Sequence, residues 1–252
     1  MTIWALLGAY WPKEPCDREF PLSSAGLIVL GQGVELRRVL TLLEEQQQPL
    51  AGVVRWQRHD RIDEDLIDAQ QLEGSRLLGS STDLRALLEK YGRSLVLALA
   101  RPIDRWEAVG VCRQAGAVLQ GLCSSSAVMA PDIDLREGAV ITQGCIIESA
   151  ASVGIGSLLL PGSRLGIGAR CGDAAVLDAG ATLDDGARIG DRVHLGSGSR
   201  VLEGRVVGQA ALVLPGSIVI SDVEAGTIVS GCPAEVIEQS FSVGGGGSPP
   251  TS

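Results

Sequence analysis

A six-residue period runs through the second half of the chain. From Ala127 to Asp222 the sequence divides into sixteen consecutive hexads, each with an apolar residue at its third position. Apolar residues make up 45% of the chain, so sixteen matches in one frame have a chance of roughly three in a million. The third positions are Met129, Leu135, Ile141, Ile147, Val153, Leu159, Leu165, Cys171, Leu177, Leu183, Ile189, Leu195, Val201, Val207, Val213 and Val219.

The remaining hexad positions indicate what this period builds. The first position is Ala, Ser or Cys in thirteen of the sixteen hexads, and Gly closes ten of them. One large and one small inward residue per hexad are typical of a triangular parallel β-helix, in which each hexad forms a short strand and a corner. An amphipathic helix is excluded, because the apolar residues lack partners at i+3 and i+4. The frame therefore predicts a left-handed parallel β-helix of hexapeptide repeats over residues 125–240.

A different pattern precedes the hexads. Short apolar runs at 26–30, 49–56, 77–79, 94–100 and 117–123 alternate with segments of helical spacing at 34–48, 82–91 and 103–115. Alternating strands and helices favour a small parallel sheet, so residues 25–124 are predicted to form a Rossmann-like α/β domain. Ser81 or Thr82 is the expected cap of the second helix. Residues 1–24 are an N-terminal extension, 59–74 a loop and 241–252, with four consecutive Gly, a flexible tail.

The composition of the chain argues against several kinds of partner. Thirty acidic and twenty-one basic residues give a net charge of −9, which argues against a nucleic-acid surface. The six Cys lie far apart without a C-x-x-C pair, so we expect buried apolar thiols rather than a metal site. Reduced thiols and the lack of a secretory signal indicate the cytoplasm. The apolar stretch 3–11 is too short to span a bilayer, so no transmembrane segment is expected.

The turn Gly31-Gln32-Gly33 after the first predicted strand is the first candidate binding site. Such a turn can bring a phosphate close to the backbone at a helix N-terminus. Leu36 replaces the third glycine of the dinucleotide fingerprint, and Glu35 places a negative charge where a phosphate would sit. A plain tight turn is therefore favoured, and Glu35 could instead contact a neutral sugar or an amino sugar.

Several short motifs together carry a resemblance to a known family. They are Leu30-Gly31-Gln32-Gly33, Leu78-Gly79-Ser80, Ser126-Ala127-Val128 and, after the hexads, Gly231-Cys232-Pro233-Ala234. In this order they resemble the sialic acid O-acetyltransferase and UDP-amino-sugar N-acetyltransferase family, over about residues 25 to 240. The resemblance implies a homotrimer with acetyl-CoA in the groove between neighbouring β-helices. It also implies a sugar or nucleotide-sugar acceptor held by the N-terminal domain, and a catalytic His that removes a proton from the acceptor.

The family's functional residues are mostly substituted here. The second His of the family pattern, which contacts acetyl-CoA, matches His194, and the catalytic His nine positions earlier corresponds to Asp185. The acidic residue that follows the base corresponds to Gly186, and the acceptor-side His of the glycine turn corresponds to Glu35. The His before the Ser-Ala-Val motif corresponds to Ser124.

The resemblance also assigns the expected donor contacts. His194, Pro215 and Gly231 are the expected acetyl-CoA-binding residues, and Gly31, Gly33 and Glu35 are the expected acceptor-binding residues. The segment 195–231 is shorter than the family pattern by about one turn of 18 residues, in the region that usually lines the CoA site.

The candidate catalytic residues are Asp185 and His194. Two positions after the inward Leu183, Asp185 should project outward, and Asp184 beside it could raise its pKa by charge repulsion. A carboxylate near pKa 3.9 is a much weaker base than an imidazole near 6.5. His194, next to the inward Leu195, should also face outward, as an acyl-CoA contact, a displaced base or a surface residue without a role.

Two functions follow from these substitutions. The first is an acetyl-CoA-dependent sugar or nucleotide-sugar O- or N-acetyltransferase of retained, altered or lost activity. The alternative is a non-catalytic trimeric β-helix that serves as a scaffold, a regulatory subunit or a sugar-binding subunit. In either case the outward residues Ile155, Leu158 and Leu160 are expected to pack between subunits.

Overall fold

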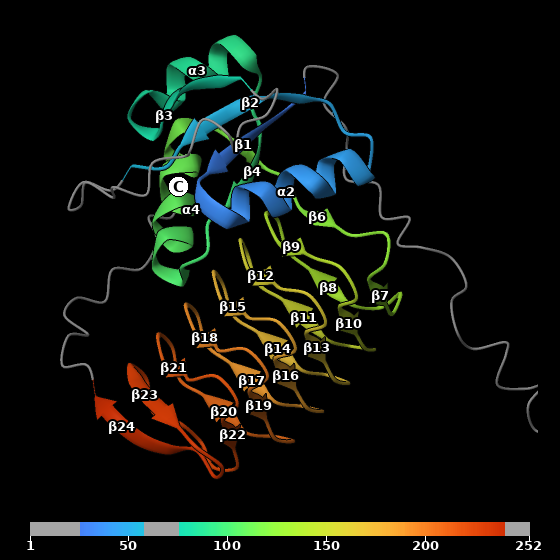
Figure 1. Ribbon diagram of the computed structural model, residues 1–252, viewed down its shortest axis with the longest axis vertical. Coiled ribbons are helices and arrows are strands. Elements are labelled where there is room, and N and C mark those ends of the chain that lie inside the picture. The colour runs from blue at the N-terminus through green and yellow to red at the C-terminus, as the bar shows by residue number, and fades with distance from the viewer. Residues whose placement is uncertain (1–25, 58–75, 240–252) are drawn as a thin grey trace, which may run out of the picture.

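The computed structural model describes residues 26–57 and 76–239, which form an α/β domain stacked on a triangular β-helix (Figure 1). The expected extension 1–24, the loop 59–74 and the tail 241–252 lie outside the described residues. Within the described part of the chain, no helix is long and apolar enough to cross a lipid bilayer.

The α/β domain is built on a five-stranded parallel sheet with the strand order β3-β2-β1-β4-β5. Successive residues of its strands alternate between two cores, as the side-chain period of a strand requires. The strands are β1 (Leu27–Gly31), β2 (Leu50–Arg55), β3 (Leu77–Ser80), β4 (Ser94–Ala98) and β5 (Val118–Leu119).

Helices cover both faces of this sheet. Helix α2 (Gly33–Glu45) packs its buried Leu36, Val39, Leu42 and Leu43 against one face. Helices α3 (Leu84–Tyr91) and α4 (Pro102–Ala115) cover the other face. The predicted Rossmann-like α/β fold is confirmed.

Two details of the expected elements were wrong. The run 117–123 is not one strand: β5 completes the α/β sheet, whereas β6 (Leu122–Cys123) is the first strand of the β-helix. A hydrophobic run alone cannot show where the chain leaves one sheet for another.

The cap of the second helix also differs from the expected Ser81 or Thr82. This helix begins with a 3-10 turn, Ser81–Asp83, and its cap is Ser80, whose side chain accepts a hydrogen bond from the Thr82 amide.

The β-helix matches the hexad frame residue by residue. Each hexad forms one two-residue strand that ends on the inward third-position residue, and paired residues lie 18 apart in adjacent coils. The sixteen strands are β7 (Val128–Met129), β8 (Asp134–Leu135), β9 (Val140–Ile141), β10 (Ile146–Ile147), β11 (Ser152–Val153), β12 (Leu158–Leu159), β13 (Arg164–Leu165), β14 (Arg170–Cys171), β15 (Val176–Leu177), β16 (Thr182–Leu183), β17 (Arg188–Ile189), β18 (His194–Leu195), β19 (Arg200–Val201), β20 (Val206–Val207), β21 (Leu212–Val213) and β22 (Ile218–Val219).

Three parallel arrays of these strands form the sides of the prism. The eight-stranded sheet contains β6, β9, β12, β15, β18 and β21, and β23 (Thr227–Ser230) and the antiparallel β24 (Glu235–Gln239) close it. The six-stranded sheet runs from β7 to β22, and the five-stranded β-helix sheet runs from β8 to β20. These three sides are those of a left-handed β-helix, so the predicted second fold is confirmed.

The corners explain the glycine that closes so many hexads. All ten glycines that close a hexad have positive φ, between 63° and 71°. Ala150, Ala174, Arg192 and Ala210 occupy the same hexad position and also have positive φ. Because a side chain is strained in this conformation, Gly is favoured there, and the three Ala and Arg192 are exceptions.

The α/β domain rests on the upper half of the eight-stranded sheet, with α2 between its own sheet and the β-helix (Figure 1). Outward residues Leu122, Val140, Leu158 and Val176 of four successive coils join the core beneath α2. The expectation that Leu158, Leu160 and Ile155 pack between subunits was therefore wrong. Leu158 and Leu160 are buried under α2, and Ile155 packs against the core beneath α4, because a domain of the same chain already covers this side.

Arg105 of α4 fastens the two units together. Its side chain is fully buried and donates hydrogen bonds to the carbonyls of Gly156, Leu99 (2.8 Å) and Ser157 (3.3 Å). Burial lowers the pKa of the guanidinium to about 9, and the nearby Glu35 carboxylate opposes this shift. The side chain is still charged at pH 7, and the three carbonyls supply the polar contacts that a buried charge requires.

A second link ties the end of α2 to the first coil. Glu45 accepts hydrogen bonds from the Ser125 amide (2.8 Å) and from the hydroxyls of Ser124 and Ser125. Gln46 donates to the Cys123 carbonyl. Partial burial alone would raise the pKa of Glu45, but the hydrogen bonds from Ser125, Ser124 and Gln143 outweigh it and lower the pKa from the ordinary value of 4.5.

Replacing Arg105 with Met should destabilise the protein by about 3 kcal/mol, because three buried carbonyls lose their donor. Urea unfolding followed by circular dichroism measures the difference. The matched control is Arg113→Met on the same helix, whose exposed ion pair with Glu137 also reaches the β-helix and should cost less than about 1 kcal/mol. Equal losses from the two variants would contradict the role given to Arg105.

Replacing Glu45 with Gln should reduce stability by about 1 kcal/mol at pH 7, a modest value because the carboxylate is exposed. A lowered folded-state pKa stabilises the protein above the unfolded value of 4.5, and this contribution disappears as the pH falls through the folded value. Urea midpoints between pH 3 and 7 should therefore converge for variant and wild type at the acid end. A difference that grew towards low pH would contradict the assignment.

Candidate functional site

The carboxyl edge of the α/β sheet lies near the β-helix, because Arg105 donates hydrogen bonds both to the Leu99 carbonyl, just after β4, and to the Gly156 carbonyl of the β-helix. The chain leaves β1 for α2 on one face and β4 for α4 on the other face, so the two connections diverge at the ends of these adjacent strands. Open α/β sheets bind their ligands at such a point. This edge of the sheet is therefore a candidate binding site.

The glycine turn lies at this edge, between β1 and α2. A Cβ on Gly31 would approach the Ala98 carbonyl oxygen to 2.0 Å, so Gly31 allows β1 and β4 to pack closely. Gly33 has φ +68° and nothing within 4 Å of the Cβ position, which leaves the first turn of α2 open to a ligand. The two glycines thus serve different purposes, of which only that of Gly33 suits binding.

Glu35 in the first turn of α2 is buried, with 6% of its surface exposed. It forms an ion pair with Arg38. Burial raises the pKa of Glu35, and Arg38 and Arg105 oppose the rise, whereas the Asp178 carboxylate of the β-helix adds to it. Glu35 therefore lies where α2 meets the coil that carries Asp178.

His194 on β18 lies next to Asp178 on the eight-stranded sheet. Its Nε2 is 3.1 Å from Asp178 Oδ1, and the two side chains are 32% and 25% exposed. Nε2 is shielded from solvent, and the contact has the length of a hydrogen bond without its alignment. The χ2 rotations of His and Asp side chains are soft, so the two groups are within reach of a hydrogen bond at this distance.

Helix α4 reaches the same coil from above. The Arg192 guanidinium lies 5.1 Å from the ring centroid of Trp106, a cation–π contact two residues before His194. The residues on either side of Trp106 make different contacts. Arg105 donates a hydrogen bond to the Gly156 carbonyl of the β-helix, and Glu107 lines a pocket. The first turns of α4 thus connect this pocket to the coil of His194.

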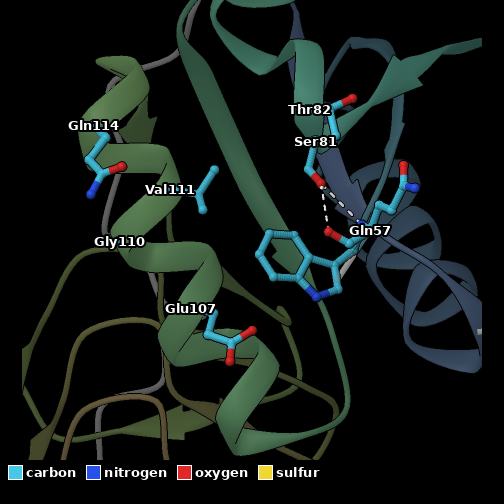
Figure 2. A pocket seen from close by; sticks show the side chains of 8 residues that line it. Gln57, Ser81, Thr82, Glu107, Gly110, Val111 and Gln114 are labelled. Atoms are coloured by element: carbon cyan, nitrogen blue, oxygen red, sulfur yellow. Dashed lines mark hydrogen bonds between the residues drawn. The ribbon is translucent and has the colours of Figure 1, made fainter. Parts of the chain in front are cut away.

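That pocket, of about 270 Å³, lies between α4 and the carboxyl ends of β2 and β3. Figure 2 shows Gln57, Ser81 and Thr82 on one side, and Glu107 and Gln114 on helix α4 on the other side. Ser81 Oγ accepts a hydrogen bond from the Gln57 amide at 3.0 Å, which joins the ends of two strands. The lining residues are Trp56, Gln57, Ser81, Thr82, Glu107, Gly110, Val111 and Gln114.

Asp185 lies elsewhere, at the corner between β16 and β17. In a triangular prism this corner is opposite the eight-stranded side, so one chain does not bring Asp185 and His194 together. Asp185 Oδ1 accepts a hydrogen bond from the Ile167 amide (3.0 Å) of the preceding coil. Its neighbour Asp184 is held by the Arg200 guanidinium (2.9 Å).

The expected donor contacts Pro215 and Gly231 follow strands that lie one and two places from the His194 strand in the eight-stranded sheet. Pro215 follows β21 and Gly231 follows β23, at the corner where the eight-stranded sheet turns into the six-stranded one. Ser217 Oγ accepts a hydrogen bond from the Gly231 amide at 3.2 Å. A Cβ on Gly196, two residues after His194, would be 2.6 Å from Pro215 N.

The structure thus places Gly33, Glu35 and His194 around one junction, with Pro215 and Gly231 below it and Asp185 on the far side. Asp178, Trp106 and Arg192 were missed from the sequence. The sequence did contain a signal for Asp178. It is the fourth residue of its hexad and His194, 16 residues later, is the second of its own, and such positions lie next to each other in adjacent coils on one side of the β-helix. No group of three or more His, Cys, Asp or Glu in the described ranges could hold a metal ion.

No family model and no curated protein sequence matches this chain. Among solved structures, PerB from Caulobacter crescentus in complex with CoA and GDP-perosamine is 24% identical, with a TM-score of 0.76 over 87% of this chain and 100% of its own. The PglB acetyltransferase domain from Neisseria gonorrhoeae in complex with acetyl coenzyme A is 22% identical, with a TM-score of 0.60 over 85% and 100%.

A third similar structure is WeeI from Acinetobacter baumannii, which is 16% identical with a TM-score of 0.64 over 84% of this chain and 100% of its own. A point variant of the Caulobacter protein, described as perosamine N-acetyltransferase, matches with a TM-score of 0.77. The chain therefore shares the fold of perosamine N-acetyltransferase and of the PglB acetyltransferase domain, a small α/β domain followed by a left-handed β-helix of hexapeptide repeats.

Proposed function

We propose that this protein transfers the acetyl group of acetyl-CoA to the amine of a nucleotide-linked amino sugar. The observation that carries the proposal is the meeting of two surfaces. At the carboxyl edge of the α/β sheet, Arg105 links Leu99 to the Gly156 corner of the β-helix, and Glu35 lies close enough to Asp178, which contacts His194, for the two charges to interact. Solved structures of this fold with CoA and GDP-perosamine, and with acetyl coenzyme A, support the choice of substrates.

The acceptor enters from the α/β domain in this proposal. The pocket between α4 and the ends of β2 and β3 receives the nucleoside, and the open first turn of α2 at Gly33 lies on the way to the β-helix. Glu35 belongs to the same turn and bounds the acceptor side. The donor enters from below, along the corner of Pro215 and Gly231, with its thioester directed at His194.

The reaction needs an acceptor for one proton. The amine nitrogen attacks the thioester carbon, the C–N bond forms, the C–S bond breaks, and the CoA thiolate leaves. An imidazole is intrinsically a much stronger base than a carboxylate, so it accepts the amine proton far better. His194 is also nearer to both expected ligands, because Asp185 lies at the opposite corner of the same chain.

Asp185 can serve only a site that a second copy completes. We propose the homotrimer that the fold resemblance implies, with the six-stranded and five-stranded β-helix sheets as its remaining open sides. Val206 and Ile146 are exposed apolar residues on these two sides. The buried thiols of Cys112, Cys145 and Cys171 support a cytoplasmic location.

A second candidate function is a non-catalytic sugar-binding, regulatory or scaffold subunit. The hydrogen bond from the Ile167 amide to Asp185 favours it, because the carboxylate at the family's base position already has a structural use. Such a subunit would bind a nucleotide sugar and release no CoA.

Light scattering coupled to gel filtration should give three times the mass of one chain. The covered upper half of the eight-stranded sheet leaves two sides of the prism for contacts between copies. A monomer at micromolar concentration would contradict the trimer and, with it, any role for Asp185 in catalysis.

Isothermal titration should show micromolar binding of acetyl-CoA that weakens on His194→Ala. Thiol release from acetyl-CoA with GDP-, UDP- and dTDP-linked amino sugars then measures turnover. Asp185→Asn keeps an acceptor oxygen for the Ile167 amide, so it decides between the two bases without disturbing the corner. A loss of about 100-fold or more identifies the base. A protein that binds neither acetyl-CoA nor CoA would contradict the proposed function.

A further inference from the structure

We propose that Asp178 is a positioning residue that holds His194 with Nδ1 free to accept the acceptor's proton. The reactive centre then lies within one chain, between the α/β domain and the eight-stranded sheet. This inference rests on the proposed acyl transfer and names the pair of residues that performs its proton transfer.

The coil register creates the pair. His194 lies beside Val176 in adjacent parallel strands, and Asp178 follows two residues after Val176, on the same outward side. Both positions are fixed by the backbone ladder, in which the Asp178 amide donates to the Leu195 carbonyl at 2.8 Å. Only the two side-chain rotations remain to be set, and rotation about χ2, which is soft in both residues, would align Nε2–H with Asp178 Oδ1, 3.1 Å away.

The carboxylate selects the tautomer. Nε2 faces Asp178 and is shielded from solvent, while about a third of the His194 side chain remains exposed. An ionised carboxylate only accepts hydrogen bonds, so it retains the proton on Nε2 and leaves the lone pair on Nδ1. The ring then presents a proton acceptor on its other side.

The Asp178 carboxylate interacts with the His194 ring rather than with another basic side chain. Among the described residues His194 is the one basic group within ion-pair distance of Asp178. Glu35, the other carboxylate that faces Asp178, is already paired with Arg38. Arg192, two residues before His194, lies over Trp106 instead. Asp178 therefore acts on His194, whereas Asp184 is held by Arg200 and illustrates a purely structural carboxylate.

Asp178 and His194 lie at the edge of the part of the eight-stranded sheet that α2 covers. Val176, one coil above His194, is buried beneath α2, whereas His194 is the first outward residue of this column that solvent reaches. An acceptor held at the carboxyl edge of the α/β sheet would approach from the covered side. An acyl donor along Pro215 would approach from the open side. In the reaction Nδ1 takes the amine proton as the C–N bond forms, and the departing thiolate takes a proton from the ring.

Nitrogen-15 NMR of the imidazoles tests the pairing without any substrate. The chain has two His, His59 and His194, so the variant His59→Gln leaves one ring in the spectrum. At pH 8.5 we expect the Nε2–H form with an observable, slowly exchanging N–H proton. Asp178→Ala should remove that resonance through fast exchange, and Asp184→Ala should leave it unchanged. An Nδ1–H form in the otherwise unaltered protein would overturn the proposal.

Kinetics test the role. His194→Gln should lower kcat by about 100-fold or more, and Asp178→Asn by about 10-fold with an unchanged KM for acetyl-CoA. Asp178→Glu should restore part of the rate. In the His194→Gln background Asp178→Asn should have no further effect, because Asp178 acts through the imidazole. A full additional loss in the double variant would overturn the positioning role.

The two proposals can fail separately. The bonded Nε2–H resonance without CoA release for any acceptor would contradict the proposed function and support the Asp178–His194 pair. Turnover that survives in both single variants would support acyl transfer and overturn this assignment of its base.

Discussion

The in-register stacking of coils determines where every residue of the β-helix lies. Each strand residue pairs with the residue 18 positions away, and the inward column of apolar side chains allows no other register. A change of one residue would turn the core column outward, so the register is also what keeps the outward columns in place. The apolar column beneath α2 and the Asp178–His194 contact both follow from this single constraint.

The hexads could be predicted in full from the sequence, because a period of six over 96 residues leaves one solution for the inward positions. The place of the α/β domain could not be predicted in the same way. Leu158 and Leu160 look like any outward apolar residues in one coil, and only their column, with Leu122, Val140 and Val176 in the neighbouring coils, indicates a helix lying across them. Apolar residues that recur every 6 positions mark the core, whereas outward apolar residues that recur every 18 positions mark the side that another domain covers.

The candidate site was predicted in part for the same reason. His194, Gly33 and Glu35 were chosen from motifs, and their meeting at one junction depends on how α2 and α4 settle on the β-helix. Arg105 has no motif, and an Arg in an amphipathic helix is usually solvated. Its burial against three carbonyls depends on a corner that is 51 residues away from it in the sequence. Contacts of that kind arise from tertiary packing, which local sequence patterns do not encode.

The repeated coil also determines how such a protein can change. Adjacent strands of a sheet lie about 4.8 Å apart, and one coil is 18 residues of nearly interchangeable backbone. Removal of a whole coil therefore moves everything below it by one strand spacing and leaves each column facing the same way. A protein with this fold can lengthen or shorten its lower half in discrete steps, without disturbing the junction of Glu35, Asp178 and His194. Insertions of any other length would rotate one part of the prism against the other.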